Sequence, residues 1–483
     1  MDTGTLNVSG NLIATTDDND GVIDLGSLAV NGSFDLTTDG TGNATVANAT
    51  ALKFITSGIG GNLSATATTG NITQSTGALT VTGTTTLVTS AQAATIDLTT
   101  ITTNGFTGEL LITTNDNDSP VDSDYEADVS IDGGTTNLII GTSTIDGNLT
   151  LLSGGTITDT ASSTVTVLND LSATTDAGGS SITLDDLTVT GSVALATNGS
   201  GNATVVNATA LDLAASTVGG DLTVTATTGN VTQSGALDIN GTGTTTITAS
   251  ASGANITLNN AGNDFEGDVS TTGNDVKLRV ASNQPISLGA ATVAGDYTVY
   301  AGTTITDCAG SCAQIITGDA KFLTHDTVSG NIVLDHASNS FGGAFETVGS
   351  IGYTVVDTSA DGIILIGRTL AGDLHVTASG PVTQSGAQIV EGLTTITATS
   401  GGTKKNVTLT HASNDFQQAV KIVGADVEIV DGVATTIGGQ SIGIDLGAST
   451  VSGTYKVTAT AGNIIDSGNL VIEGIATVLA STT

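Results

Sequence analysis

The densest group of residues with metal-binding chemistry lies in one acidic stretch, TTNDNDSPVDSDYEAD, at residues 113–128. Oxygen ligands at alternate positions suit Ca²⁺, which takes roughly six to eight of them. The D-x-[DN]-x-[DN]-G pattern with a trailing Glu is not present, so a solvated acidic loop is the alternative interpretation. Calcium is therefore the one cofactor that the sequence suggests. Its candidate ligands are Asp116, Asp118, Asp122, Asp124, Glu126 and Asp128.

Other side chains with reactive chemistry are few. Cys308 and Cys312, in DCAGSC, are close enough for a small local disulfide, with two inert thiols as the alternative. His336 and His411 occupy equivalent places in two repeats. An active site is normally single, so this repetition indicates a structural position. Carboxylate pairs of the kind that cleave sugars arise by chance among 46 acidic residues. We therefore expect no catalytic residues and no enzyme.

A short repeat must position all of these residues. Each copy opens with glycine and a small polar residue and continues as an alternating strand, as in GDLTVTATTGNVTQSG from Gly220. Nineteen such starts between Gly10 and Gly474 give a mean spacing of about 26 residues. A regular period of about 20 to 50 residues is typical of stacked repeats. Apolar residues alternate with threonine inside each copy, which predicts strands with one buried face.

Composition favours an all-β chain. Glycine is abundant (64), proline scarce (3), aromatic residues make up 3%, and tryptophan is absent. Thr, Val and Ile suit a pleated, half-buried surface, and Gly, Asn and Asp supply turns. A β-sandwich is the alternative, but a period of about 26 residues is too short for one such domain. The sequence therefore predicts one continuous parallel β-helix over residues 1–483, with about nineteen coils of roughly 20–29 residues.

Larger units are superimposed on this repeat. Three coils form a module of about 75 to 81 residues, and the block 8–108 recurs at 168–267. The two longest intervals predict loops at 113–128 and 424–440, where function is often found. One phenylalanine recurs per module, and we expect these rings to fill the core as structural residues. They are Phe106, Phe265, Phe341 and Phe416.

Charge restricts the partners. With 46 acidic and 9 basic residues the net charge is −37, which repels phosphate backbones and anionic lipid heads. Nucleic acid is therefore excluded as a partner, and cations or basic surfaces are favoured. The sequence contains no stretch of about 20 apolar residues, so it predicts no transmembrane segment. No signal peptide follows Met1, so we expect any export signal to lie outside this sequence.

The repeat resembles the filamentous-haemagglutinin-like exoproteins, the large secreted adhesins of Gram-negative bacteria. The resemblance rests on the GNL and GDL strand starts, on TATTGNVTQSG and ITLNNAGNDFEG, and on the Thr/Asn/Gly-rich composition, and it covers essentially the whole chain. It implies a right-handed parallel β-helix at the cell surface or outside the cell. It also implies a non-enzymatic stalk that makes adhesive or biofilm contacts with a cell-surface glycan or protein.

Two other classes of function remain open. A self-assembling surface-layer or fibre subunit would join further copies of itself end to end or side by side. Ice binding would use rows of threonine, but residues such as Ile13 and Glu109 interrupt the equivalent positions. A carbohydrate-active β-helix is the least favoured, because basic residues are few and scattered.

Overall fold

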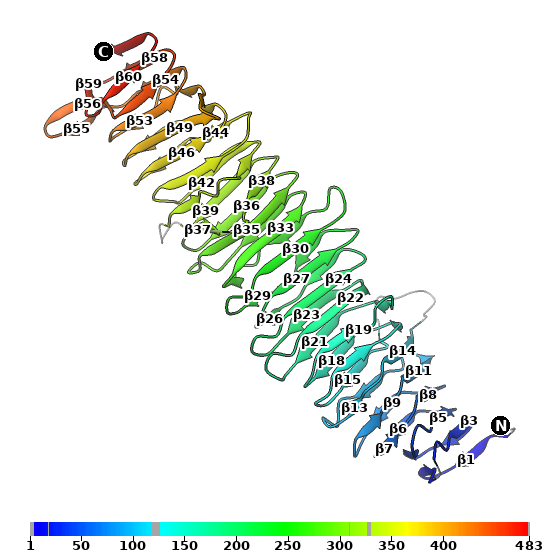
Figure 1. The fold of residues 1–483 in the computed structure, drawn as a ribbon. Helices are drawn as coiled ribbons and strands as arrows, with labels where there is room; N and C mark the ends of the chain where they lie inside the picture. Colours follow the sequence, from blue (N-terminus) through cyan, green and yellow to red (C-terminus); the bar gives the residue numbers. More distant parts are fainter. Residues whose placement is uncertain (1–3, 18, 117–125, 309, 326–329, 482–483) are drawn as a thin grey trace. The chain divides into compact units, whose positions relative to one another are not determined.

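The computed structural model describes residues 4–17, 19–116, 126–308, 310–325 and 330–481 (Figure 1). The chain divides into two compact units, residues 1–245 with 249–251 (unit 1) and residues 246–248 with 252–483 (unit 2). The described residues form strands and turns and contain no helix. Together the units hold about 22 turns of a parallel β-solenoid, which confirms the predicted fold class and is close to the expected nineteen coils.

Each turn has two sides, which belong mainly to two parallel sheets, A and B, while three short strands of unit 2 form a third parallel sheet. One side is a wide strand of mostly four to six residues, and the other is a split pair of two shorter strands or one long strand with a register shift. Inside a wide strand the side chains alternate between core and surface, as in β8 (Leu63–Ala67) with its three buried positions. Aliphatic residues therefore fill most of the core, while most outward positions of the strands are polar, although some threonines such as Thr85 are buried.

The first complete module of unit 1 has its wide strands in sheet A. These are β5 (Ala44–Asn48), β8, β11 (Thr85–Gln92) and β14 (Leu110–Asn115). Its split pairs in sheet B are β6 (Leu52–Phe54) with β7 (Ser57–Ile59), β9 (Ile72–Gln74) with β10 (Leu79–Val81), and β12 (Ile96–Leu98) with β13 (Gly105–Phe106). Before it lie β1 (Leu6–Val8), β2 (Leu12–Thr15), β3 (Ile23–Val30) and β4 (Phe34–Thr37).

The second module of unit 1 reverses the two sheets. Its wide strands lie in sheet B: β15 (Val129–Asp132), β18 (Leu149–Ser153), β21 (Leu171–Thr175) and β23 (Ser192–Ala196). Its split pairs lie in sheet A: β16 (Leu138–Ile140) with β17 (Ser143–Ile145), β19 (Ile157–Asp159) with β20 (Val165–Val167), and the long β22 (Ile182–Val189). The wide strands then return to sheet A with β24 (Ala203–Asn207) and β27 (Leu222–Ala226), opposite β25 (Leu211–Leu213), β26 (Ser216–Val218), β28 (Val231–Gln233) and β29 (Leu237–Ile239).

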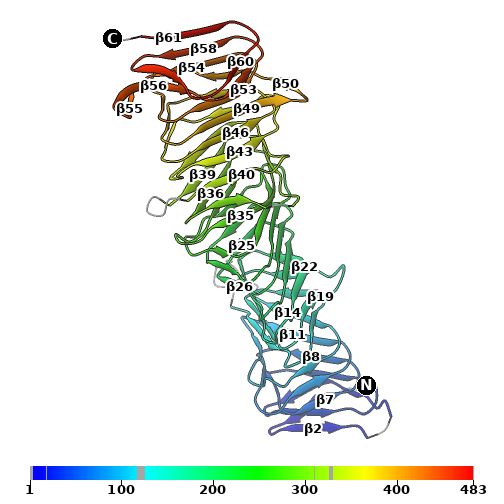
Figure 2. The same cartoon turned by 60° about the vertical axis from the view of Figure 1, so that its left-hand side comes forward.

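Unit 2 shows the same reversal. Several of its strands, among them β36 (Tyr297–Ala301) and β39 (Ala320–Thr324), are labelled in Figure 2. After β31 (Ile256–Leu258), β32 (Asp264–Phe265) and β33 (Asp268–Gly273), the wide strands in sheet B are β34 (Val276–Arg279), β36 (Tyr297–Ala301), β39 (Ala320–Thr324) and β42 (Ala344–Val348). Opposite them in sheet A lie β35 (Ile286–Val293), β37 (Ile305–Asp307) with β38 (Gln314–Ile316), and β40 (Ile332–Leu334) with β41 (Ser340–Phe341).

The next module of unit 2 has wide strands in sheet A: β43 (Tyr353–Asp357), β46 (Leu374–Ala378), β49 (Thr394–Ser400) and β53 (Val420–Gly424). Its split pairs are β44 (Ile363–Leu365) with β45 (Arg368–Leu370), β47 (Val382–Gln384) with β48 (Gln388–Val390), and β51 (Val407–Leu409) with β52 (Asp415–Phe416). The last strands are β54 (Val427–Asp431), β56 (Gln440–Leu446), β57 (Ser449–Val451), β58 (Tyr455–Ala459), β59 (Asn463–Asp466), β60 (Leu470–Ile472) and β61 (Ala476–Ala480).

A complete module thus contains four wide strands and three split sides, which is about three and a half turns. Because of the half turn, the next module begins on the opposite sheet. Two modules are needed to return to the same sheet. This explains the duplication of 8–108 at 168–267, since β24 begins 159 residues after β5 and lies in the same sheet.

The predicted loop at 424–440 is wrong for most of its length. Val427, Ile429 and Asp431 alternate inward, so this segment forms the wide strand β54. It is followed by an antiparallel hairpin of β55 (Thr435–Ile437) with β56. The long interval therefore reflects an extra wide strand and a hairpin. The other predicted loop, 113–128, connects β14 to β15, and its residues 117–125 lie outside the described part of the chain.

The four phenylalanines that mark the modules are all buried. Each ends a strand of two residues, β13, β32, β41 or β52. Unit 2 adds a group of rings around Phe341, in which neighbouring ring centroids are 5.1 to 6.3 Å apart. No helix in the described ranges is long and apolar enough to cross a membrane.

Candidate functional site

A row of Asn and Asp side chains stands just before the wide strands. The side-chain oxygen of one turn accepts a hydrogen bond from the backbone N–H of the equivalent residue in the next turn. In unit 1, Asp128 accepts from Asn148 (2.8 Å), and Asn148 accepts from Asp170 (3.1 Å). We call this row the Asx ladder. A run made only of carboxylates occurs in unit 2, at Asp275, Asp296 and Asp319.

The ladder also explains the glycine that opens the repeat. The N–H of Gly318 donates to the carbonyl of Gly295 (2.9 Å), so equivalent glycines of successive turns are in contact. A Cβ on Gly318 would lie 2.5 Å from the Asp296 carboxylate, and one on Gly343 would lie 2.6 Å from that of Asp319. The Gly-Asx-apolar start is therefore a packing requirement of the stack.

Buried amide pairs connect two motifs of the module: the glutamine that ends the ITQ or VTQ strand, and the asparagine two residues before the module phenylalanine. The Gln74 side chain donates to Asn104 (2.7 Å) and accepts a bond in return (3.0 Å). Gln384 and Asn414 form the same reciprocal pair at 2.8 and 2.9 Å. Both asparagines are almost fully buried, and each stands two residues before the module phenylalanine. Both motifs are visible in the sequence, but the contact across 30 residues is not.

Two buried aspartates connect neighbouring modules in unit 2. Asp357 and Asp431 accept hydrogen bonds from the backbone N–H groups of Phe341 (2.9 Å) and Phe416 (3.0 Å), respectively. Burial raises the pKa of Asp431 to about 7, against the lowering effect of two backbone donors, and the carboxylate of Asp415 raises it further. Burial also raises the pKa of Asp357. The sequence signal that could have found them is the strand period, because each aspartate falls on an inward position of an alternating strand.

The two repeated histidines stabilise turns. In His336 and in His411, Nδ1 accepts the backbone N–H of the residue two positions later, at 3.2 and 3.1 Å. Asn260 makes the equivalent bond with its side-chain oxygen at 2.9 Å. The turn thus needs an acceptor two residues before a backbone donor, and either residue type supplies it. The geometry gives these histidines a structural role.

Cys308 and Cys312 are joined by a disulfide that closes the turn between β37 and β38. Their sulfur atoms and a carboxylate oxygen of Asp268 lie within 4.8 Å of one another, the one such group of three found in the described part of the chain. A disulfide offers no thiolate to a metal. The oxidised chain therefore leaves Asp268 as the one charged ligand there, and Ser287 donates to it at 2.5 Å.

The structure brings together some of the predicted calcium ligands. The Asp116 carboxylate accepts the backbone N–H of Glu126 (2.9 Å), which closes the base of the acidic stretch. The Asp128 carboxylate belongs to the Asx ladder. One oxygen of each carboxylate is thus already used by the chain. The remaining candidates, Asp118, Asp122 and Asp124, lie outside the described residues.

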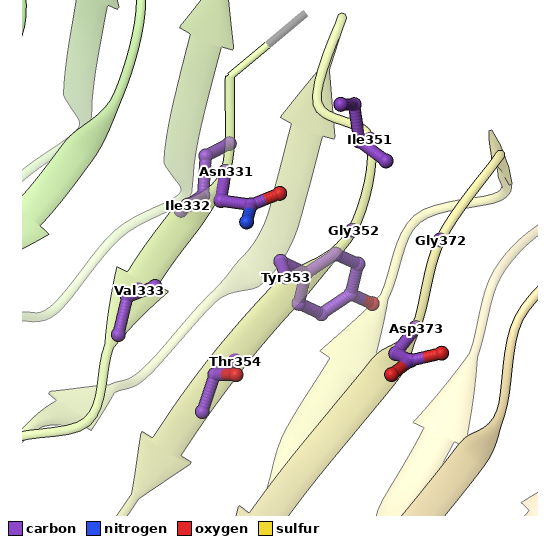
Figure 3. A pocket seen from close by; sticks show the side chains of 9 residues that line it. All are labelled: Asn331, Ile332, Val333, Ile351, Gly352, Tyr353, Thr354, Gly372 and Asp373. Carbon is purple, nitrogen blue, oxygen red and sulfur yellow. The ribbon is translucent and has the colours of Figure 1, made fainter.

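A shallow polar hollow of about 350 Å³ opens beside Tyr353 in unit 2. Figure 3 shows the tyrosine ring between the side chains of Asn331 and Asp373. The residue just before β43 is Gly352, where other turns have an Asn or Asp. The Asx ladder therefore has no side chain at this turn, between Asn331 and Asp373. Burial raises the pKa of Tyr353, which keeps its hydroxyl protonated. The hollow offers hydrogen-bonding groups to a small polar molecule but no paired nucleophile and base among its lining residues.

Comparison with known proteins agrees with the module boundaries. Searches of curated proteins and of solved structures found no match. A family model described as "Repeats of unknown function (DUF5649)" matches residues 41–113, 200–272, 273–348, 352–423 and 431–483, well over half of the chain. The complete matches coincide with the three-and-a-half-turn modules, and the module with the acidic stretch lies between two of them. The chain is a structural protein built of repeats, and it belongs to the DUF5649 repeat family.

Proposed function

We propose that the chain is a non-enzymatic stalk segment of a secreted or surface-attached bacterial adhesin that makes cell-surface or biofilm contacts. One observation carries the proposal: the most strongly held polar residues are those that repeat. The Asx ladder and the buried amide pairs occur again from module to module and join each turn to the next. Such residues maintain a stack of turns, and the resemblance to secreted adhesins supports a role outside the cell.

The outward faces of the wide strands support a carbohydrate or protein partner. In sheet A of unit 1, Thr45, Ser64 and Thr86 are register neighbours in three successive turns. Thr204 and Thr223 repeat this pattern in the third module. A row of hydroxyl groups on a rigid sheet can donate to and accept from sugar hydroxyls or a peptide backbone. A glycan or protein on another cell is the partner that we propose.

The absence of catalysis is part of the proposal. His336 and His411 use Nδ1 in their own turns, and the two sulfur atoms are joined in a disulfide. These residues therefore have structural partners where an enzyme would need free reactive groups.

The adhesive role is tested with beads that carry the whole chain. We expect such beads to bind cells more strongly than beads coated with an unrelated protein of equal charge. Loss of binding after enzymatic removal of cell-surface glycans would identify a glycan partner, and loss after protease treatment a protein partner. Equal binding of both kinds of bead would contradict the proposal. Antibody labelling of intact, unpermeabilised source cells tests the location.

Calcium at the acidic stretch is a separate proposal. Asp116 and Glu126 meet at its base, and carboxylate oxygens are preferred ligands of Ca²⁺. Calorimetric titration of the whole chain with Ca²⁺ should show a binding step that disappears when the carboxylates of the stretch are replaced by amides. An unchanged step in that variant would place calcium elsewhere.

A further inference from the structure

One outward face of unit 2 carries charged residues that its equivalents in unit 1 lack. In the two complete modules of unit 1, every outward residue of the wide strands is uncharged. In unit 2, the equivalent face of β34, β36, β39 and β42 carries Lys277, Arg279, Lys321 and Glu346. We call it the charged face. Three of the nine basic residues of the chain thus lie on four strands.

The charges on this face are arranged in straight rows. Lys277, Thr298, Lys321 and Glu346 are register neighbours in four successive wide strands. A parallel row lies two residues earlier and consists of the ladder carboxylates Asp275, Asp296 and Asp319. Neighbours within a row are about 4.8 Å apart, and the two rows are about 6.6 Å apart. The face therefore presents an acidic row beside a basic row.

The ion pairs within the chain leave this pattern in place. Glu346 contacts Lys321 at 3.1 Å and also pairs with Arg368 from the next turn. Glu346 is therefore neutralised by Arg368 even when Lys321 turns elsewhere. Arg279 lies over the ring of Tyr300, 4.9 Å from its centroid, which adds an aromatic and cationic element of the kind enriched in protein interfaces.

We propose that the charged face is a contact between two copies of this chain. Consider a two-fold axis that lies between the two copies and runs parallel to the rows. This axis places the acidic row of one copy opposite the basic row of the other, and each residue keeps its position along the stack of turns. The carboxylates Asp275 and Asp319 of one copy then lie opposite Lys277 and Lys321 of the other, and the reverse holds at the same time. A two-fold axis across the rows would instead place carboxylates against carboxylates. The two solenoid segments must therefore run parallel and in register.

The contact is weak for a single module. Four strands about 4.8 Å apart and five residues of about 3.3 Å cover roughly 300 Å². A standard interface buries about 800 Å² on each partner. Exposed ion pairs add little affinity and mainly fix orientation. We therefore expect a short-lived side-by-side contact between two copies. Several such faces acting together would bind more tightly than one.

Carbodiimide cross-linking tests the proposal, because it joins a lysine to a carboxylate in direct contact. Whole chains labelled with ¹⁴N and with ¹⁵N are mixed at up to about 1 mM, where weak contacts are populated. Mass spectrometry then identifies cross-links between the two isotopes, which are intermolecular. We expect these to join Lys277 or Lys321 to the peptides that contain Asp275, Asp296 and Asp319.

Two variants make the test specific. In D275N/D296N/D319N the ladder keeps its side-chain oxygens, as it does at Asn148, but loses the charge. In K277T/K321T the lysines become the residue at position 298 of the same row. Each variant alone should lose the cross-links at this face. Mixing the two should restore them in one direction, from the lysines of the first variant to the carboxylates of the second.

Three results would overturn the proposal: no mixed-isotope cross-link at this face, cross-links that persist in either variant, or cross-links spread evenly over Lys53, Lys421 and Lys456. Far-UV circular dichroism of both variants checks that the fold is kept. The contact is independent of the proposed adhesive role. If the beads bind cells but no cross-links form, the contact between copies is rejected and adhesion is not. If cross-links form but the beads do not bind cells, adhesion is rejected and the contact is not.

Discussion

Replacing Asn414 by alanine tests whether the buried amide pairs hold the turns together. The Asn414 side chain accepts from Gln384 (2.8 Å) and from the backbone N–H of Gln388 (2.9 Å). Its amide donates to Gln384 (2.9 Å) and to the carbonyls of Leu409 and Val430 (both 3.1 Å). One side chain thus satisfies polar groups from three successive turns.

The cost of the substitution follows from these contacts. Alanine removes this partner from two buried backbone groups, of Gln388 and Leu409, and from the part-buried carbonyl of Val430. The Gln384 side chain is free to turn away. Each buried polar group left unsatisfied costs about 1 to 3 kcal/mol. We therefore expect a local loss of about 3 kcal/mol, which corresponds to roughly a hundredfold increase in the opening constant. Turns of a solenoid contact only their neighbours, so distant turns should be unaffected.

Hydrogen exchange followed by mass spectrometry measures this local opening. Peptides that cover Gln388 and strand β54 should exchange about a hundredfold faster in Asn414→Ala, while those of unit 1 remain unchanged. Asn406→Ala is the matched control, because Asn406 accepts a single exposed ladder bond from Asp426 at 3.1 Å. Similar effects of the two substitutions would refute the reasoning. A double-mutant cycle with Gln384→Ala should show strong coupling, and additive effects would mean that the pair is not a unit.

Three further predictions concern single positions. Because burial raises the pKa of Asp431 to about 7, the folded chain holds a proton there that the unfolded chain releases near pH 4. Stability against urea should therefore fall between about pH 4 and 7 and level off above, and Asp431→Asn should lack this component, as followed by circular dichroism. His411→Asn should keep its turn and His411→Ala should lose about 1 kcal/mol, and equal thermal midpoints would argue against the Nδ1 bond. Gly343→Ala should destabilise by about 2 kcal/mol or more in the same assay, whereas Gly10→Ala, with nothing within 4 Å of its Cβ, should be neutral.

Part of the difference between nineteen expected coils and about 22 observed turns comes from the strands that begin a module in unit 2. The first wide strand of a module begins at Val276, Tyr353 or Val427 in unit 2. Two residues earlier stand Asn274, Ile351 and Ala425, so these strands lack the glycine that marks most of the others. All three strands show the alternation of apolar and polar residues. Without the glycine, however, the sequence assigns each of them to the coil that precedes it. The loop predicted at 424–440 is wrong for the same reason.

The sequence could not reveal which side chains meet across turns. The Gln74 and Asn104 motifs each recur once per module, yet their reciprocal contact depends on how many residues each corner consumes. The same holds for Asp116, which contacts Glu126 while its neighbours in the acidic stretch lie outside the described residues. A side chain at a given sequence spacing faces its partner only after the path of the turn is fixed.

By itself, the sequence determined the class of fold, the module length and the core. These follow from properties local to each strand: a side-chain period of two, β-branched residues, and a glycine where no Cβ fits against the previous turn. Tertiary structure alone decided that a module is three and a half turns, that successive modules reverse the two sheets, and which polar residues pair. The physical reason is that turns are closed by contacts between residues about 20 to 30 positions apart, and their register depends on the whole stack.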